Sequence, residues 1–121
     1  MVSAGTRICI SIAEKPGTLG AQFHNAGYEA LGLDVLYLPR LVRKHQLEDA
    51  MAGIRGLGIR GCSVTKPHKE DVLRYLQKID PKARQIGAVN TIVREEDGTL
   101  TGYNTDYTGA RRAIREHTNI D

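Results

Sequence analysis

Short apolar runs alternate with longer amphipathic segments along this chain, and that alternation constrains its fold more than any other feature. Runs of strand length lie at 7–12, 35–38 and 59–64. Between them, apolar residues recur at the spacing of helices. Because the connections from strand to helix to strand are short, we expect a right-handed α/β arrangement. The expected fold is a three-layer αβα domain with a mostly parallel sheet, which takes up residues 1–121 as one unit.

Glycine and proline indicate where these elements end. The apolar positions of the first helix, at a spacing near 3.6, are Phe23, Ala26, Ala30 and Leu31. Gly32 is placed to end that helix in the left-handed conformation. Pro39 is expected to stop the second strand. Gly58 is expected to close the second helix, whose buried stripe is Leu47, Ala50, Met51, Ile54 and Leu57.

The second half of the chain predicts two further helices and a hairpin. Pro67 suits the first turn of a helix whose inward residues are Val72, Leu73 and Leu76. Asp80, followed by a proline, suits the start of a short helix that runs through Ile86. The Asp97-Gly98 step between two strand-like runs signals a hairpin, which adds an antiparallel strand to the sheet. The segment 106–114 is expected to be helical.

Composition argues against several classes of protein. Hydrophobic residues make up 40% of the chain and charged residues 26%, which is typical of a globular domain. No apolar run approaches the ~18–20 residues that a membrane span needs, and the first residues show no secretory signal. The net charge of +3 is mild, and the basic residues neither cluster nor alternate with aromatic ones. We therefore expect a cytoplasmic protein that binds neither a membrane nor nucleic acid.

The cysteines and histidines give no sign of a metal site. Cys9 and Cys62 lie in two separate apolar runs, which predicts buried thiols in a reducing compartment. A disulfide or a catalytic thiol is the alternative. The His and Cys residues do not stand at the spacing of metal ligands, so no zinc site is expected.

Polar residues gather where expected strands end, in loops that begin at Ala13, Thr65 and Asn104. Ligands of such sheets sit beyond the carboxyl ends of the strands. A carboxylate within ~4–6 Å orients a lysine, and the pair can pass a proton to and from a hydroxyl that becomes a carbonyl. Lys69 and Asp106 are candidates for this pair. Taken singly, Lys69 also fits a surface lysine, and Asp106 fits the N-cap of the last helix.

Other polar residues are more ambiguous. Asn90 stands in an otherwise apolar run, where its amide is costly unless it is hydrogen-bonded. His68 fits a surface or packing residue better than a ligand. Gln22, Asn25 and Thr105 are weaker site candidates, because each also fits a cap or a surface group. The tyrosines at 37, 75 and 107 are interpreted as packing residues.

Four segments are distinctive when taken together: FHN at 23–25 with LGLD at 31–34, SVTKPHK at 63–69, GAVNT at 87–91, and GYNTDYTG at 102–109. In this order they resemble the shikimate dehydrogenase family, and specifically its N-terminal, substrate-binding domain. The resemblance extends from Ile8 to about Ile114, which is nearly the whole chain. It implies the fold of the amino-acid-dehydrogenase-like N-terminal domain.

The resemblance also implies an activity, which is the reversible NADP-linked oxidation of the 3-hydroxyl of shikimate or of a related cyclic polyhydroxy acid such as quinate. By motif position, Lys69 matches the family's catalytic lysine and Asp106 its partner aspartate, which also contacts substrate. Asn90 and Thr65 match residues that hold substrate hydroxyls. Domains of this family often pair, which makes a homodimer an expectation as well.

One departure from the family pattern concerns the substrate carboxylate. In the family, two serines of a Ser-x-Ser loop bind it, and those positions fall here on Thr18 and Gly20. Thr18 keeps one hydroxyl donor, whereas Gly20 has none, which should cost roughly 1.5–3 kcal/mol of binding to a charged group. Lys66 stands at a position that is usually apolar in the family, and it either compensates in charge or faces solvent. The combination resembles the divergent shikimate dehydrogenase-like branch.

A dinucleotide site would need a Gly-x-Gly-x-x-Gly turn between a strand and a helix, and the chain has none in that context. We therefore expect NADP to be bound mainly by a Rossmann domain that is absent here, and the chain alone to bind substrate weakly without catalysis. Two alternatives stay open. One is a non-catalytic small-molecule binding module derived from this family, and the other is an unrelated small α/β regulatory domain.

Overall fold

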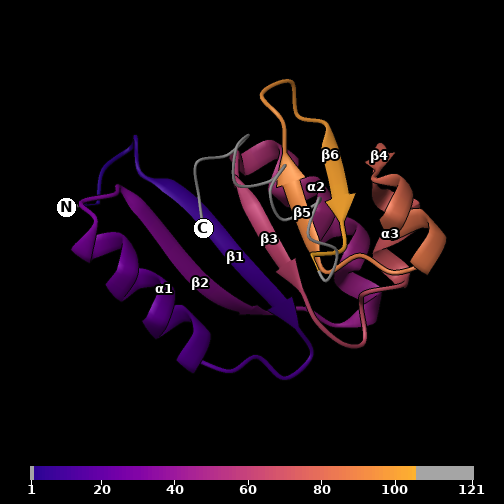
Figure 1. Cartoon of the computed structure of the whole chain (residues 1–121), viewed down its shortest axis with the longest axis horizontal. Coiled ribbons are helices and arrows are strands. Elements are labelled where there is room, and N and C mark those ends of the chain that lie inside the picture. The colour runs from indigo at the N-terminus through magenta and orange to yellow at the C-terminus, as the bar shows by residue number, and fades with distance from the viewer. Residues whose placement is uncertain (1, 106–121) are drawn as a thin grey trace.

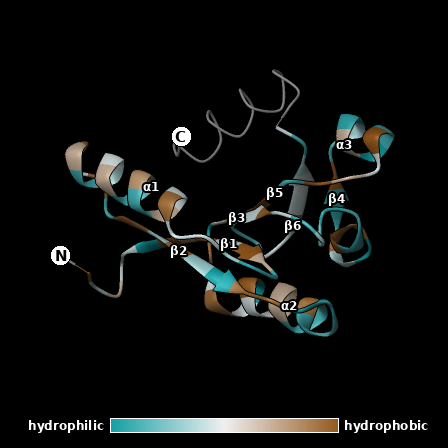
Figure 2. Ribbon diagram, turned by 90° about the horizontal axis from the view of Figure 1, so that it is seen from below, coloured by the Kyte–Doolittle hydropathy of each residue, from teal (hydrophilic) through white to brown (hydrophobic). Residues whose placement is uncertain are grey.

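Helices lie on both faces of a six-stranded sheet in the computed structural model, which describes residues 2–105 (Figure 1). The strands are β1 (Arg7–Ala13), β2 (Val35–Leu41), β3 (Gly61–Val64), β4 (Lys78–Ile79), β5 (Thr91–Arg94) and β6 (Leu100–Tyr103). The α-helices are α1 (Leu19–Ala30), α2 (Leu47–Leu57) and α3 (Pro81–Ile86), and two short 3-10 helices are η1 (Lys44–Gln46) and η2 (Asp71–Tyr75). Helices α1 and α2 cover opposite faces of the sheet (Figure 2).

The strand order is β2-β1-β3-β5-β6-β4, and both parallel and antiparallel pairs occur. β1 runs parallel to β2 and β3, and β4 runs parallel to β6. β5 is antiparallel to both of its neighbours, β3 and β6. The α/β fold, the mostly parallel sheet and the antiparallel hairpin are thus confirmed. The two-residue strand β4 was not expected from the sequence.

The main core lies between α2 and the sheet. Leu47, Met51 and Ile54 each expose only 1% of their surface and pack with the inward side chains of the strands. Gly58 ends α2 with a φ of +67°, as the sequence predicted. In this left-handed conformation glycine avoids the steric cost that a Cβ would bring.

Helix α1 is oriented differently from what its apolar spacing indicates. The four positions that define the helix in the sequence, at 23, 26, 30 and 31, are all exposed, and Phe23 exposes 72% of its surface. Ala21 and Tyr28 are buried instead, against Val35 and Tyr37 of β2. The helical period was therefore predicted correctly, but the face that packs on the sheet is the one that carries Tyr28.

Two prolines have effects that the sequence did not predict. β2 continues through Pro39 to Leu41, because it pairs only with β1, and an edge strand tolerates a missing N–H. Pro67 follows a cis peptide bond and begins no α-helix. The chain there forms a turn that leads into the 3-10 helix η2, so Lys69 does not lie on the first turn of a helix.

The two cysteines are free and buried, as predicted, with 5% of Cys9 and 2% of Cys62 exposed. Burial raises the pKa of both thiols, because a thiolate would lose its hydration in the core. Both therefore stay protonated and act as small apolar side chains. A catalytic thiol is excluded at these positions.

The packing around Gly102 of β6 leaves no room for a side chain, which leads to a prediction for stability. A Cβ at this position would lie 2.5 Å from Cδ1 of Leu76 and 2.8 Å from Cγ2 of Val89. We expect Gly102→Ala to lower the free energy of unfolding by about 1–3 kcal/mol in urea denaturation. Gly53→Ala is the matched control: it lies in α2 with no atom within 4 Å of the added methyl, and should stabilise by up to about 1 kcal/mol. A neutral Gly102→Ala would contradict this account.

Candidate functional site

Three loops meet at one edge of the sheet, by which we mean the row of strand ends and not an outer strand. The parallel strands β1 and β3 both end there, and β6 ends there too because β5 reverses direction between β3 and β6 (Figure 1). Thr65 follows β3, Asn90 precedes β5, and Thr105 follows β6. The structure thus brings together segments that are far apart in the sequence.

Main-chain hydrogen bonds fix these loops to one another. The Val64 N–H donates to the carbonyl of Asn90 at 2.8 Å, and the Asn90 N–H donates to the carbonyl of Tyr103 at 3.0 Å. The Val89 N–H donates to the carbonyl of Lys69 at 2.8 Å. Lys69 is therefore held beside the loop segment that leads into Asn90, so the main chains of two predicted site residues lie near each other.

The Lys69 side chain is half-buried at this edge. Among residues 2–105 its ammonium makes no hydrogen bond or ion pair. Asp106, its predicted partner, lies outside the described residues and directly follows Thr105. The Lys69–Asp106 pair therefore stays a prediction.

Asn90 has its side-chain oxygen satisfied within the protein. Its Oδ1 accepts hydrogen bonds from the Thr91 hydroxyl at 2.9 Å, from the Thr105 N–H at 2.9 Å and from the Thr105 hydroxyl at 3.2 Å. These bonds offset the cost of a half-buried amide at a strand end. Thr105, a weak candidate in the sequence, here contacts Asn90.

Thr65 is exposed, and its hydroxyl donates to the carbonyl of Ile12 at 3.1 Å. Because the hydroxyl proton is used in this bond, Thr65 offers a ligand the lone pairs of its oxygen. The bond also ties the loop after β3 to the end of β1. Thr65 is thus well placed for the role that its motif position implies.

His68 is completely buried and anchors the loop that carries Lys69. Its Nε2 lies 2.7 Å from the carbonyl oxygen of Val42, and its main-chain N–H donates to the carbonyl of Thr65. Since a carbonyl can only accept, Nε2 carries the proton in this bond. Sequence reasoning classed His68 as a surface or packing residue, and packing is what the structure shows.

Thr18 and Gly20 lie at the N-terminal end of α1, where Thr18 is the N-cap residue. The Thr18 hydroxyl makes no capping hydrogen bond, so it is available to a ligand. A Cβ added at Gly20 would have nothing within 4 Å. The glycine is therefore not required by packing, and it leaves open space where the family has a serine.

Two further candidates from the sequence differ in role. The Asn25 side chain is bonded to the main chain of Tyr37 in both directions, with the Asn25 Nδ2 donating to the carbonyl at 2.9 Å and the Tyr37 N–H donating to Oδ1 at 2.7 Å. Asn25 is thus a structural residue that joins α1 to the edge strand β2. Gln22 is exposed on α1 and has no side-chain hydrogen bond within the described part of the chain.

Tyr103, at the end of β6, carries a titratable phenol, and its main-chain carbonyl accepts a hydrogen bond from the Asn90 N–H. Partial burial raises its pKa, and the negative charges of Glu95 and Asp80 raise it further. The phenol therefore stays protonated at neutral pH and is unsuited to act as a base. Of the titratable side chains named at this edge, Lys69 is the better candidate for proton transfer.

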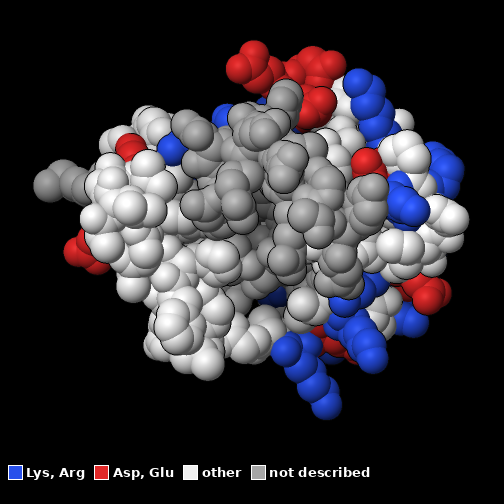
Figure 3. All heavy atoms as spheres, viewed as in Figure 1, with Lys and Arg blue, Asp and Glu red and all other residues white. Residues whose placement is uncertain are grey.

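Acidic side chains gather at one edge of the sheet, whereas basic side chains lie both there and at the opposite edge. In the view of Figure 3, Lys and Arg side chains project at the lower edge, below the end of β3, and acidic side chains gather at the top, over the β5–β6 turn. Positive charge on a surface attracts anionic ligands. The distribution is therefore compatible with an anionic substrate at the edge that carries Lys69.

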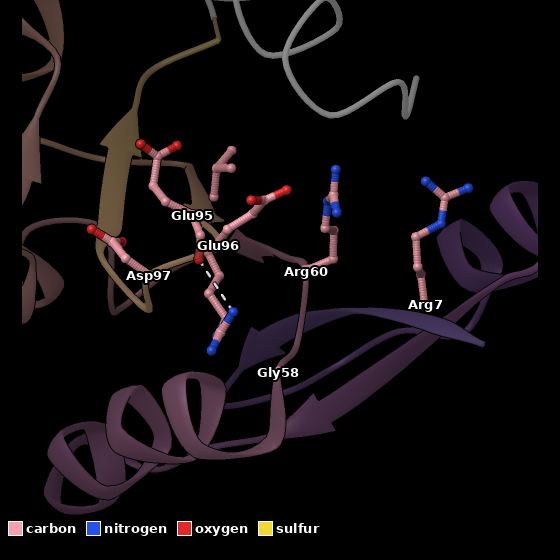
Figure 4. Close-up of a pocket in the computed structure, with 8 residues that line it drawn as sticks. Arg7, Gly58, Arg60, Glu95, Glu96 and Asp97 are labelled. Carbon is pink, nitrogen blue, oxygen red and sulfur yellow. Dashed lines mark hydrogen bonds between the residues drawn. The ribbon is translucent and has the colours of Figure 1, made fainter. Parts of the chain in front are cut away.

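An open pocket of about 590 Å³ lies at the opposite edge (Figure 4). Arg7 and Arg60 line one side, and Glu95, Glu96 and Asp97 line the other. None of the residues that the sequence predicted for the site borders it. This pocket is therefore separate from the candidate site.

The described residues do not fit a bound dinucleotide. Gly53 and Gly56 lie within α2, Gly58 ends it, and Gly61 lies in β3, so these glycines form no phosphate-binding turn between a strand and a helix. Within residues 2–105 no three His, Cys, Asp or Glu side chains gather as metal ligands. No helix in this range is long and apolar enough to span a membrane.

Comparison with known proteins gives consistent matches. Residues 17–92 match the family described as shikimate dehydrogenase substrate binding domain. The NADP(+) shikimate dehydrogenase of Methanothermobacter thermautotrophicus is 45% identical over 104 residues, which cover 86% of this chain and 36% of that protein. A shikimate dehydrogenase-like protein of Haemophilus influenzae is 39% identical over 117 residues, which cover 97% of this chain and 42% of that protein. The chain thus spans about two fifths of these relatives.

Solved structures agree with these matches. Shikimate 5-dehydrogenase from Listeria monocytogenes, in complex with shikimate and NAD, superimposes with a TM-score of 0.81 at 36% identity, over 99% of this chain and 41% of that one. A 5-ketofructose reductase of Gluconobacter superimposes with a TM-score of 0.80 at 32% identity, over 92% of this chain and 40% of that one. Proteins named for different substrates therefore share this fold.

The role of Asn25 generates a prediction. Asn25→Ala removes two hydrogen bonds and leaves the N–H and C=O of Tyr37 without these partners, so we expect the free energy of unfolding to fall by about 2–3 kcal/mol. Gln22→Ala, on the same helix, is the control and should change it by less than about 0.5 kcal/mol. Urea denaturation of both variants checks this. Equal stability of the two variants would restore Asn25 as a candidate ligand.

Proposed function

Because the chain belongs to the shikimate dehydrogenase family and contains its substrate-binding domain, we propose that it binds shikimate or a related cyclic polyhydroxy acid at the edge formed by Thr65, Lys69 and Asn90. The observation that carries this proposal is the set of main-chain hydrogen bonds that hold Lys69 beside the loop segment leading into Asn90. They fix the main chain of Lys69, whose side chain is half-buried, near the segment of Asn90, whose amide oxygen is already satisfied. Such a pair suits a ligand with several hydroxyls.

The proposed reaction of the protein that contains this domain is the reversible oxidation of the substrate 3-hydroxyl to a ketone, with NADP as the oxidant. In that reaction Lys69, as the neutral amine, takes the hydroxyl proton on Nζ as the carbonyl forms, and returns it in the reverse direction. Asp106 is proposed to orient Lys69 and to contact the substrate. Since the described residues do not fit a dinucleotide, NADP is proposed to bind to a part of the protein outside this chain, and the 121 residues alone are proposed to be inactive.

The substrate carboxylate is proposed to lie at the start of α1. The free Thr18 hydroxyl supports this position, as do the first N–H groups of the helix, which have no partner within the helix and favour negative charge. Gly20 contributes no side-chain donor, so binding through this group is proposed to be weak. A cytoplasmic location and pairing of two copies are carried forward as proposals. Exposed Leu19 and Phe23 on α1 are apolar surface that such pairing would bury.

A titration of the 121-residue chain with shikimate, followed by the shifts of its backbone amide signals in NMR spectra, tests the proposal. We expect weak binding at millimolar concentration, with shifts at Thr65, Asn90 and Thr105 and none at Arg7 or Arg60 of the opposite pocket. A cyclohexene carboxylate without hydroxyls is the control ligand and should cause smaller shifts at Asn90. Adding NADP should produce no NADPH. Shifts confined to the opposite pocket, or no binding, would contradict the proposed site.

Replacing Gly20 tests the carboxylate position. Gly20→Ser places a hydroxyl in open space one residue into α1, so we expect shikimate to bind about 10- to 100-fold more tightly, as for a hydrogen bond to a charged group. Gly27→Ser is the matched control, because it lies in the same helix with equally open space but away from the N-terminal end. Isothermal titration calorimetry gives both affinities. The same affinity for both variants would show that the carboxylate lies elsewhere.

A further inference from the structure

The orientation of the Asn90 carboxamide is settled by one of its partners. An amide side chain can be turned over so that its oxygen and nitrogen exchange places, and hydroxyl partners accept either arrangement. A main-chain N–H can only donate. Because the Thr105 N–H lies 2.9 Å from the carboxamide, the atom that faces it is the oxygen.

The oxygen of Asn90 is also fully used. It accepts from two hydroxyls and one N–H, which is more than its two lone pairs ordinarily serve. It therefore has no capacity left for a donor from a ligand. The other end of the carboxamide, Nδ2, carries two N–H groups and has no partner among residues 2–105. Among residues 2–105 this end is the part of the carboxamide with unused hydrogen-bonding capacity, so it is the part that can bind a ligand.

The backbone keeps the carboxamide in this position. The Asn90 main chain is bonded on one side to Val64 and on the other to Tyr103, so its Cα cannot shift without breaking the ladder. Thr91 is paired directly with Ser63 of β3 and with Tyr103 of β6, which fixes the strand position from which its hydroxyl reaches Oδ1. The donor end of Asn90 is thus set by the sheet itself.

We propose that Thr91 and Thr105 are positioning residues that hold Asn90 as a donor only, so that the site selects ligand oxygens that can accept from its N–H groups. This inference rests on the proposed binding of a polyhydroxy acid, and it specifies how that ligand is recognised. A hydroxyl of the ligand must accept from Asn90 and send its own proton elsewhere. The ligand hydroxyl proton is thereby left free for another acceptor, in keeping with the role proposed for Lys69.

Four variants, titrated with shikimate, separate positioning from general stability. Thr91→Val removes one hydroxyl and should weaken binding about two- to tenfold, whereas Thr91→Ser keeps the hydroxyl and should restore it. Thr101→Val is the matched control, because the buried Thr101 hydroxyl in β6 has no partner among the described residues. It should leave affinity unchanged. Asn90→Asp keeps an oxygen for the three donors but replaces the donor end, so it should fold and bind at least about tenfold more weakly.

A measurement without ligand tests the orientation directly. In the free wild-type chain, labelled with ¹⁵N and ¹³C, we expect a scalar coupling through the hydrogen bond between the Thr105 nitrogen and Cγ of Asn90. Its absence overturns the inference, as does Asn90→Asp binding as tightly as wild type, or Thr91→Val behaving like Thr101→Val. If the coupling is present but wild type does not bind shikimate, the proposed function fails and the orientation of Asn90 stands.

Discussion

The reversal of β5 between β3 and β6 is the constraint on which the candidate site depends. In a purely parallel sheet the start of β5 would lie at the far edge, and Asn90 would be separated from the loops after β3 and β6. Because β5 is antiparallel to both neighbours, Asn90 instead joins the ladder where Val64 and Tyr103 end their strands. A single hairpin thus brings a polar residue to the edge where Lys69 is held.

The loop that carries Lys69 is ordered without a regular helix. Its fixed points are the buried His68 ring on the Val42 carbonyl, the Thr65 hydroxyl on the Ile12 carbonyl, and the Lys69 carbonyl that accepts from Val89. These contacts come from β1, from the residue that follows β2 and from the loop that precedes β5. A lysine held in this way loses less conformational freedom when it meets a ligand than one on a mobile loop.

Much of the fold could be predicted because it follows local rules. Gly58 ends α2, Asp80 caps α3, and Gly98 turns the hairpin, each through a conformation or bond that neighbouring residues specify. What failed depends on contacts distant in sequence. The spacing of the apolar residues from Phe23 to Leu31 predicted a helical period but not the face that packs on the sheet. Pro67 met the rule for a helix start, but polar groups of its loop bond to β1 and to the segment before β5 instead. The site residues Thr65, Lys69 and Asn90 were predicted from motifs, but the main-chain bonds that hold their segments together depend on strand order, which spacing does not specify.

The two ends of the candidate site differ in how freely they can change. Asn90 is part of the main-chain ladder, and its oxygen is engaged by Thr91 and Thr105, so a substitution there changes the sheet as well as the ligand contacts. At the start of α1, the Thr18 side chain makes no capping hydrogen bond and Gly20 has open space around it, so side chains there can vary without affecting the core. Side chains at the helix end are therefore freer to vary in such a fold than Asn90 is. That a shikimate dehydrogenase and a 5-ketofructose reductase share this fold is consistent with this division.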